Sequence, residues 1–74
     1  MVAATVTTAG DGIDSEVHFS GLGAEGYALR AAAAAKTAHP EGLVGIEIRR
    51  CDGSREILDV SLDTAGRIWY TRIR

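Results

Sequence analysis

Three glycines with the spacing G-x-G-x-x-G, namely Gly21, Gly23 and Gly26, come between a predicted strand and a predicted helix. Glu47 follows about twenty residues further along, where a dinucleotide site carries its ribose-binding acid. In such a site the glycines admit the pyrophosphate close to the helix N-terminus. Here, however, the neighbouring strands alternate in polarity, unlike the continuous apolar strands of a parallel sheet. We therefore interpret Gly21 and Gly23 as shaping the start of the helix, with nucleotide binding by residues 21–26 as the alternative.

Residues suited to nucleophilic or metal chemistry are few. The two histidines are His18 and His39, and a nucleophile such as Ser20 or Cys51 could pair with one of them. Nucleophilic catalysis needs a base within hydrogen-bond reach and a third group that orients it, and the spacing of these residues indicates no such set. Metal ligands at i and i+4 on a helix are also missing. The sequence thus predicts no catalytic residue, no metal site and no cofactor.

Arginines gather in the C-terminal half of the chain, at positions Arg49, Arg50, Arg55, Arg67, Arg72 and Arg74. Guanidinium groups suit carboxylates, phosphates and protein interfaces. Charged side chains on strands also discourage aggregation between sheet edges, which is the plainer interpretation of these residues. A nucleic-acid-binding domain that uses the arginine-rich strands is the second hypothesis.

Trp69 is the one tryptophan of the chain and alternates with Ile68 and Tyr70. If Ile68 and Tyr70 face the core, Trp69 faces outward beside Ile57 and Thr71. An exposed tryptophan among arginines and acids has the composition of a protein-binding hot spot. In the opposite register Trp69 lies in the core and Tyr70 outside. Both registers stay open at this stage, and each leaves one aromatic side chain on the outer face.

Apolar and β-branched residues alternate with polar ones in five segments, which predicts five strands. These are residues 2–8, 16–20, 44–49, 57–62 and 67–73. Glycines that can adopt positive φ predict the three hairpin turns, around residues 9–12, at Asp52-Gly53, and at residues 63–66 with a type I turn and a bulge.

Residues 24–38 are strong helix formers almost throughout and include five consecutive alanines. Glu25 near the start, and Lys36 and His39 near the end, complement the helix dipole. Pro40 ends the helix, because the residue before a proline avoids helical backbone angles. The alanines should let this helix lie close to a sheet.

The order β-β-α-β-β-β with short hairpins predicts a single α+β domain over residues 1–74, a largely antiparallel five-stranded sheet with the helix packed on one face. The expected core consists of Val6, Val17, Phe19, Leu29, Val44, Ile46, Ile48, Leu58, Val60, Leu62, Ile68 and Tyr70. The opposite face is expected to carry His18, Glu47, Arg49, Ile57, Asp59, Trp69 and Thr71, and is left for water or a partner.

Composition narrows the function classes. The 74 residues carry 10 acidic and 8 basic side chains, for a net charge of −2, which is not the charge balance of a basic nucleic-acid binder. A single cysteine excludes an internal disulfide and a multi-cysteine zinc site. The longest apolar run, residues 31–35, is too short to span a membrane. No signal peptide is visible at the start, so we expect a cytoplasmic protein.

The strand and helix order resembles that of small phage anti-CRISPR proteins that inhibit type I Cascade complexes. The resemblance is closest from the helix onward, in the alanine-rich helix and the following segment 41–48 (EGLVGIEI). Residues 63–70 (DTAGRIWY) are similar to a D-x-G-[KR]-x-W stretch of that family. The resemblance covers most of the chain in the order of strands and helix, and few residues are shared.

The resemblance implies a non-enzymatic inhibitor that docks on the backbone subunits of Cascade and keeps target DNA from pairing with the guide RNA. Inhibitors of this family use basic side chains of the helix and adjoining strands, and only Arg30 and Lys36 match on this helix. The outer sheet face is the second choice for the contact. Together these expectations give the partner-binding residues Arg30, Lys36, Arg49, Asp59, Arg67 and Trp69. No direct contact with nucleic acid and no membrane association are expected.

Overall fold

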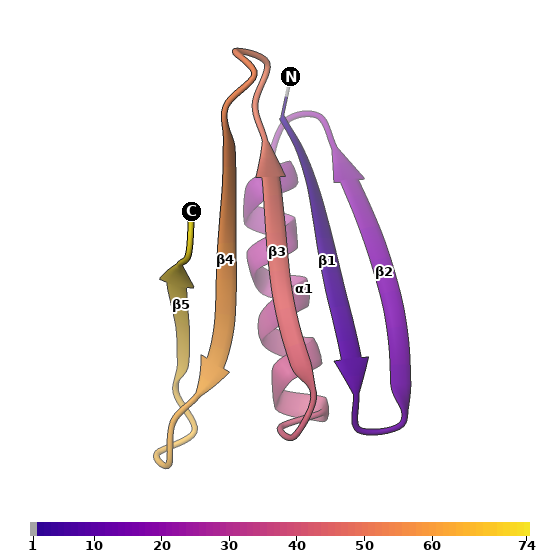
Figure 1. Cartoon of the computed structure of the whole chain (residues 1–74), viewed down its shortest axis with the longest axis vertical. Helices are drawn as coiled ribbons and strands as arrows, with labels where there is room; N and C mark the ends of the chain where they lie inside the picture. The colour runs from indigo at the N-terminus through magenta and orange to yellow at the C-terminus, as the bar shows by residue number, and fades with distance from the viewer. Residues whose placement is uncertain (1) are drawn as a thin grey trace.

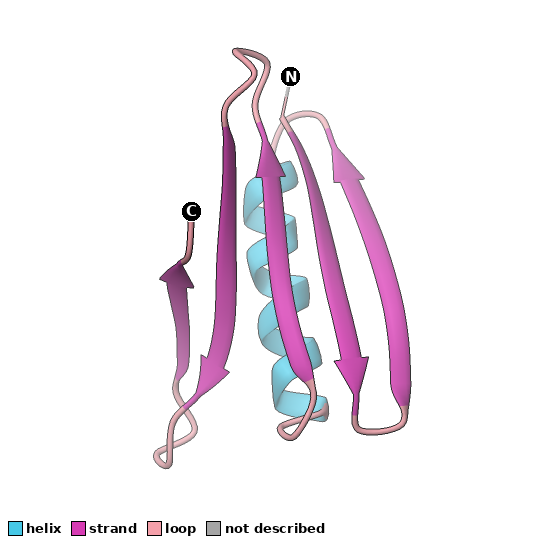
Figure 2. Ribbon diagram, viewed as in Figure 1, coloured by secondary structure: helices cyan, strands magenta, loops and turns pink. Residues whose placement is uncertain are grey.

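The computed structural model describes residues 2–74 and places one helix against one face of a five-stranded antiparallel sheet (Figure 1). The strands are β1 (Ala3–Gly10), β2 (Ile13–Ser20), β3 (Leu43–Arg49), β4 (Arg55–Leu62) and β5 (Ile68–Arg72), and their spatial order is β2-β1-β3-β4-β5. Helix α1 (Ala24–Ala38) leads from β2 to β3 and passes over β1, which lies between them (Figure 2). The predicted α+β class, the strand count and the helix are confirmed.

The three hairpins follow the glycines, with one difference from expectation. Asp11 and Gly12 have φ of 53° and 77°, so β1 and β2 are joined by a two-residue type I′ turn. Between β3 and β4, the Gly53 N–H donates to Arg50 O and the Arg50 N–H donates to Ser54 O, both at 3.0 Å. Asp52-Gly53 therefore ends a three-residue loop with a left-handed glycine, and Gly66 ends the same kind of loop between β4 and β5.

The core lies between α1 and the centre of the sheet, where Val6, Val44, Ile46, Ile48 and Val60 are almost completely buried. The other buried apolar side chains are small, and these are Ala4, Ala24, Ala28 and Ala32. The three helical alanines are spaced i, i+4, i+8, so they form one stripe that lets the helix approach the sheet closely. Alanines therefore fill more of this core than the sequence analysis assigned to them.

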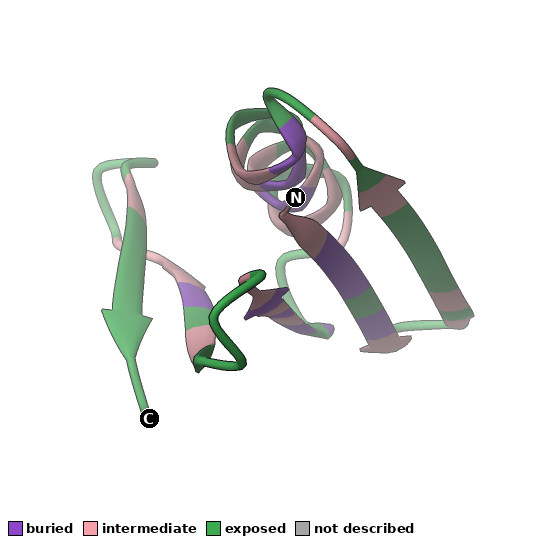
Figure 3. Cartoon of the chain, turned by 90° about the horizontal axis from the view of Figure 1, so that it is seen from above, coloured by how far each residue is buried: buried purple, intermediate pink, exposed green. Residues whose placement is uncertain are grey.

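Two residues expected in the core are exposed instead. Val17 and Tyr70 point to the helix side of the sheet as predicted, but 44% and 39% of their surface is accessible. Helix α1 packs mainly on β1 and β3, so it covers the outer strands β2 and β5 less completely (Figure 3). Five more residues expected in the core are only partly buried, and these are Phe19, Leu29, Leu58, Leu62 and Ile68.

Past its last regular pair, β5 ends in a bulge. The N–H groups of Ile73 and Arg74 both approach Ile57 O, at 2.8 and 3.4 Å, and the Ile57 N–H donates to Arg74 O. Two residues thus oppose one, the pattern of a β-bulge. Ile73 itself keeps the regular register opposite Ile57, so both side chains lie on the same face of the sheet.

Candidate functional site

The sheet face turned away from α1, here called the outer face, has no element of the described residues packed on it (Figure 3). Val44, Ile46 and Ile48 point to the helix, so the residues between them point to the outer face. The strand register extends this alternation across the sheet. It places on the outer face all the residues predicted there, namely His18, Glu47, Arg49, Ile57, Asp59, Trp69 and Thr71.

Trp69 lies on the outer face and is 52% exposed. Tyr70 takes the opposite side, where its hydroxyl donates to the backbone oxygen of Leu29 on the helix at 2.7 Å. This hydrogen bond decides between the two registers that the sequence left open. The Arg67 guanidinium carbon lies 5.5 Å from the centre of the Trp69 ring, a cation–π arrangement.

Asp63 holds Trp69 and Arg67 together. Its Oδ2 accepts from Trp69 Nε1 at 2.9 Å and from Arg67 Nε at 3.1 Å, while its Oδ1 accepts from the backbone N–H groups of Ala65 and Arg67. The hydrogen bond from Trp69, together with those from Arg67 and Ala65, lowers the pKa of Asp63 below its ordinary value. The carboxylate therefore stays charged at neutral pH and fixes an exposed aromatic ring in one orientation.

An apolar groove of about 280 Å³ lies on the same face, at the end of the sheet where β3 begins. Its floor is Gly45, which has no side chain, and its walls include Leu43, Ile57 and Ile73. Leu43 and Ile73 are 74% and 63% exposed, which are high fractions for aliphatic side chains. Asp59 is exposed at the side of this groove, so an acidic group borders an apolar surface.

The other end of the outer face is polar and internally paired. Glu47 accepts from Arg49 Nη1 at 2.6 Å through one oxygen and lies 3.2 Å from Arg55 Nε through the other. Arg49 also donates to Thr5 Oγ1, which in turn lies 3.0 Å from His18 Nδ1. These contacts form a row of polar interactions across β2, β1, β3 and β4. The guanidinium of Arg49 is therefore already bonded to neighbours within the chain.

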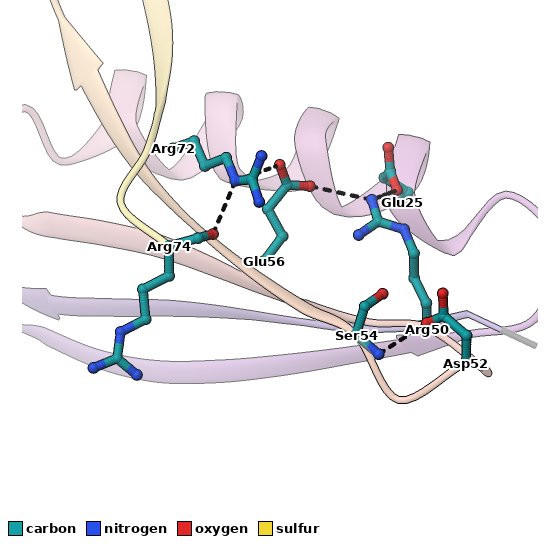
Figure 4. A network of polar contacts seen from close by, with 7 residues as sticks. All are labelled: Glu25, Arg50, Asp52, Ser54, Glu56, Arg72 and Arg74. Atoms are coloured by element: carbon teal, nitrogen blue, oxygen red, sulfur yellow. Dashed lines mark hydrogen bonds and ion pairs between the residues drawn. The ribbon is translucent and has the colours of Figure 1, made fainter.

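Arginines on the helix side of the sheet also form ion pairs with carboxylates of this chain (Figure 4). Arg50 Nη2 lies 3.1 Å both from Glu25 on α1 and from Glu56 on β4. Arg72 Nε lies 3.5 Å from the other oxygen of Glu56. Hydrogen bonding to Glu56, with the charges of Glu25 and Glu56, raises the pKa of Arg50. The network connects the first turn of the helix to the β3–β4 hairpin.

The helical residues predicted to bind a partner lie apart from the outer face and from each other. Arg30 is exposed and its guanidinium carbon lies 4.9 Å from the centre of the Tyr27 ring. Lys36 Nζ donates to Gly42 O at 2.6 Å and so fastens the end of the helix to the loop before β3. Of the six predicted contact residues, the structure therefore brings Arg49, Asp59, Arg67 and Trp69 to one face, with Arg30 and Lys36 on the helix.

The glycine loop borders an open hollow of about 400 Å³, lined by Val2, Gly21, Leu22, Gly23, Ala24 and Glu25. Gly21 and Gly23 have φ of 95° and 80°, so they take the left-handed backbone that turns the chain into the helix. Leu22 is fully exposed at 102%. The one charged side chain that lines this hollow is Glu25, an acid paired with Arg50, so the lining offers no basic side chain to a phosphate. The loop therefore has the shape but not the charge of a nucleotide site.

Two further findings concern the described residues alone. Within residues 2–74, no group of three or more histidine, cysteine, aspartate or glutamate side chains is arranged to hold a metal ion. The helix that the structure describes is too short and too polar to cross a bilayer.

Comparison of the chain with protein-family models, with curated proteins and with solved structures found no match.

Part of the outer-face site was not predicted from the sequence. Asp63 was assigned to a turn and not to the site, although an aspartate four and six residues before an arginine and a tryptophan can reach both once the turn closes. Leu43 and Ile73 were not assigned to the site either. Leu43 could have been found, because it precedes the strand pattern in step with the outer-face residues 45, 47 and 49. Ile73 could have been found in the same way, because it is in step with the outer-face residues Trp69 and Thr71.

Proposed function

We propose that this chain is a non-enzymatic inhibitor that binds a protein partner through its outer face. The observation that carries the proposal is Trp69, an exposed aromatic side chain whose orientation is already fixed by Asp63 and Arg67. Binding through such a side chain requires little further ordering, and aromatic anchors of this kind dominate the energy of protein interfaces.

The surroundings of Trp69 support a protein partner over a nucleic acid. An apolar groove with exposed Leu43 and Ile73 lies on the same face, which suits an aliphatic or aromatic side chain of a partner. Five arginines of the C-terminal half each contact a carboxylate of this chain, and these are Arg49, Arg50, Arg55, Arg67 and Arg72. Little uncompensated positive charge is thus offered to phosphates, and the net charge is −2.

The partner we propose is a backbone subunit of a type I CRISPR Cascade complex, because the order of elements, the alanine-rich helix and residues 63–70 resemble those of anti-CRISPR proteins. A rigid domain of this size inhibits by covering a surface that target DNA must enter. Acidic side chains such as Asp59 would then meet the basic groove that otherwise receives DNA. The inhibitor acts by occlusion, so it needs no catalytic residue.

A binding assay with purified type I Cascade complexes tests this proposal. The chain is expected to co-purify with the complex and to prevent target-DNA binding when it is added first. Leu22→Ala is the matched control for Trp69→Ala, because it removes an exposed apolar side chain that lies outside the outer face. Failure to associate with any type I complex would rule out this partner. Salt-dependent binding of DNA or RNA by the chain alone would favour the nucleic-acid hypothesis instead.

A further inference from the structure

Strand β2 is an open edge of the sheet, and of the features that normally protect such an edge it has only the acidic side chains of Asp14 and Glu16 (Figure 1). Its eight residues pair with β1 in one continuous register without a bulge, and they include no proline, lysine or arginine. The opposite edge, β5, has only five residues, carries Arg72 and ends in the bulge at residues 73–74. Bulges and basic residues are what sheets use to prevent pairing with another chain, so β2 is the edge that is competent to pair.

The backbone groups that β2 leaves free can be assigned. The Gly21 N–H donates to Val2 O at 2.9 Å, and the two-residue turn pairs Ile13 with Gly10. Both facts place the odd-numbered residues of β2 in its hydrogen-bonded pairs with β1. The N–H and C=O groups that point to the open edge therefore belong to Asp14, Glu16, His18 and Ser20.

An apolar margin runs along the same edge on the helix side. Val17, at the centre of β2, is 44% exposed even though it pairs with the buried Val6. Phe19 packs against the core from the same side and is only partly buried. Helix α1 lies mainly over β1 and β3, so within the described residues this margin is not completely covered (Figure 3).

We propose that the chain forms a symmetric dimer in which β2 pairs antiparallel with β2 of a second copy, about a two-fold axis at Val17. In this register Val17 meets Val17 of the second copy in a non-hydrogen-bonded pair, where side chains approach most closely. Glu16 lies opposite His18 of the second copy, twice by symmetry. The two sheets become one, with both helices on one side and both outer faces on the other.

Charge selects this register over its neighbours. The free N–H and C=O groups of β2 belong to even-numbered residues, so each hydrogen-bonded pair of the dimer must join two even-numbered residues. The two-fold axis must then pass through a residue and cannot pass between two residues. An axis at Glu16 sets two carboxylates opposite each other, and an axis at Ser15 sets Asp14 opposite Glu16 twice. An axis at His18 opposes two imidazoles and leaves Glu16 facing a serine. Within one chain, His18 Nε2 already lies 3.0 Å from Glu16 Oε1. The register centred on Val17 brings two such Glu16–His18 pairs together, with each glutamate opposite the histidine of the other copy.

Symmetric disulfide trapping tests the register. The single cysteine is first removed by Cys51→Ser, and Val17→Cys or Ser15→Cys is added to the full chain. Facing residues of a non-hydrogen-bonded pair are close enough for a disulfide, so Val17→Cys is expected to cross-link under mild oxidation. Ser15→Cys is the matched control on the same strand and side, and it faces Phe19 of the second copy. Equal cross-linking of the two variants, or none in either, would overturn the proposal.

Sedimentation equilibrium on the unmodified chain gives an independent reading. The mass is expected to rise with concentration from 7.8 kDa toward twice that value. His18→Glu should weaken the association about tenfold, because two like-charged pairs then form in each dimer. Adding Glu16→Lys to His18→Glu should restore it, with circular dichroism confirming the fold of each variant. A mass of 7.8 kDa up to millimolar concentration, or no rescue by the double variant, would contradict the proposed pairing.

Discussion

Trp69 Nε1 donates a hydrogen bond of 2.9 Å to Asp63 Oδ2 across the turn that joins β4 to β5. The same carboxylate accepts from two backbone N–H groups of that turn, so the orientation of the ring is coupled to the shape of the loop. A partner that contacts Trp69 therefore meets a side chain that is already ordered. Because Trp69 is the only tryptophan, its fluorescence reports on this arrangement directly.

Asp63→Ala should release Trp69 while leaving the sheet folded. We expect a shift in the emission maximum and a loss of anisotropy, because the ring loses its hydrogen bond and Arg67 loses the carboxylate that holds it. Steady-state fluorescence and far-UV circular dichroism measure the two effects. Asp52→Ala is the control, since Asp52 accepts from the Ser54 N–H in the other three-residue loop. An identical spectrum in Asp63→Ala would mean that Asp63 does not position the ring.

Acidification should disturb Trp69 only below the ordinary range of aspartate. The pKa of Asp63 is lowered, chiefly by the hydrogen bond from Trp69, so its charged form is favoured in the folded state. Its contribution to stability is present above the unfolded pKa of about 3.9 and is lost as pH falls through the lower folded pKa. A fluorescence titration should show a midpoint below pH ~3.9 that Asp63→Ala abolishes. A midpoint at or above that pH would contradict the shift.

Gly45→Val should fill the groove without harming the fold. A Cβ at this position would meet its nearest neighbour, Leu58 O, at 3.6 Å, which is ordinary van der Waals contact. Valine also favours strand backbone, so stability should rise by about 0.5–1 kcal/mol. Chemical denaturation measures this change, and partner affinity should fall because the floor of the groove is raised. Unchanged affinity in a stable Gly45→Val variant would remove the groove from the binding surface.

Ala28→Leu should destabilise the protein, because Ala28 is fully buried in the stripe where the helix touches the sheet. Extra carbon atoms there force the two layers apart, at a cost of about 1–3 kcal/mol or more. Ala34→Leu is the matched control on the exposed side of the same helix and should change stability by less than about 0.5 kcal/mol. Equal unfolding free energies for the two variants would show that close helix packing is unnecessary.

The fold could be predicted from local patterns in the sequence. Alternation located the strands, Pro40 and the alanine run bounded the helix, and the outer-face residues followed from the period of two. The core was harder, because burial depends on where the helix sits across the sheet. Val17 is apolar and points to the helix side of the sheet, as a core residue should. It is nevertheless exposed, because it lies on a strand that the helix covers incompletely.

The site was less accessible to sequence reasoning than the fold. Whether Trp69 or Tyr70 faces outward depends on strand register, which the Tyr70–Leu29 hydrogen bond reveals only in three dimensions. The arginines left a nucleic-acid interface open as the second hypothesis. Some of their partners are close in sequence, as with Arg67 and Asp63, and others are distant, as with Arg50 and Glu25. Sequence order shows how many charges are present and does not show which of them are paired.

The central claim is that Trp69 serves binding while its neighbour Tyr70 serves the fold, and paired measurements on Trp69→Ala and Tyr70→Ala test it most directly. Trp69→Ala should lower affinity for a type I Cascade complex about thirtyfold, a change typical of an interface hot spot. Its unfolding free energy should change by less than about 1 kcal/mol. Tyr70→Ala should lose about 1–3 kcal/mol of stability through lost packing and the lost hydrogen bond to the helix. The reverse pattern, with Trp69→Ala unfolded and Tyr70→Ala defective only in binding, would contradict the account.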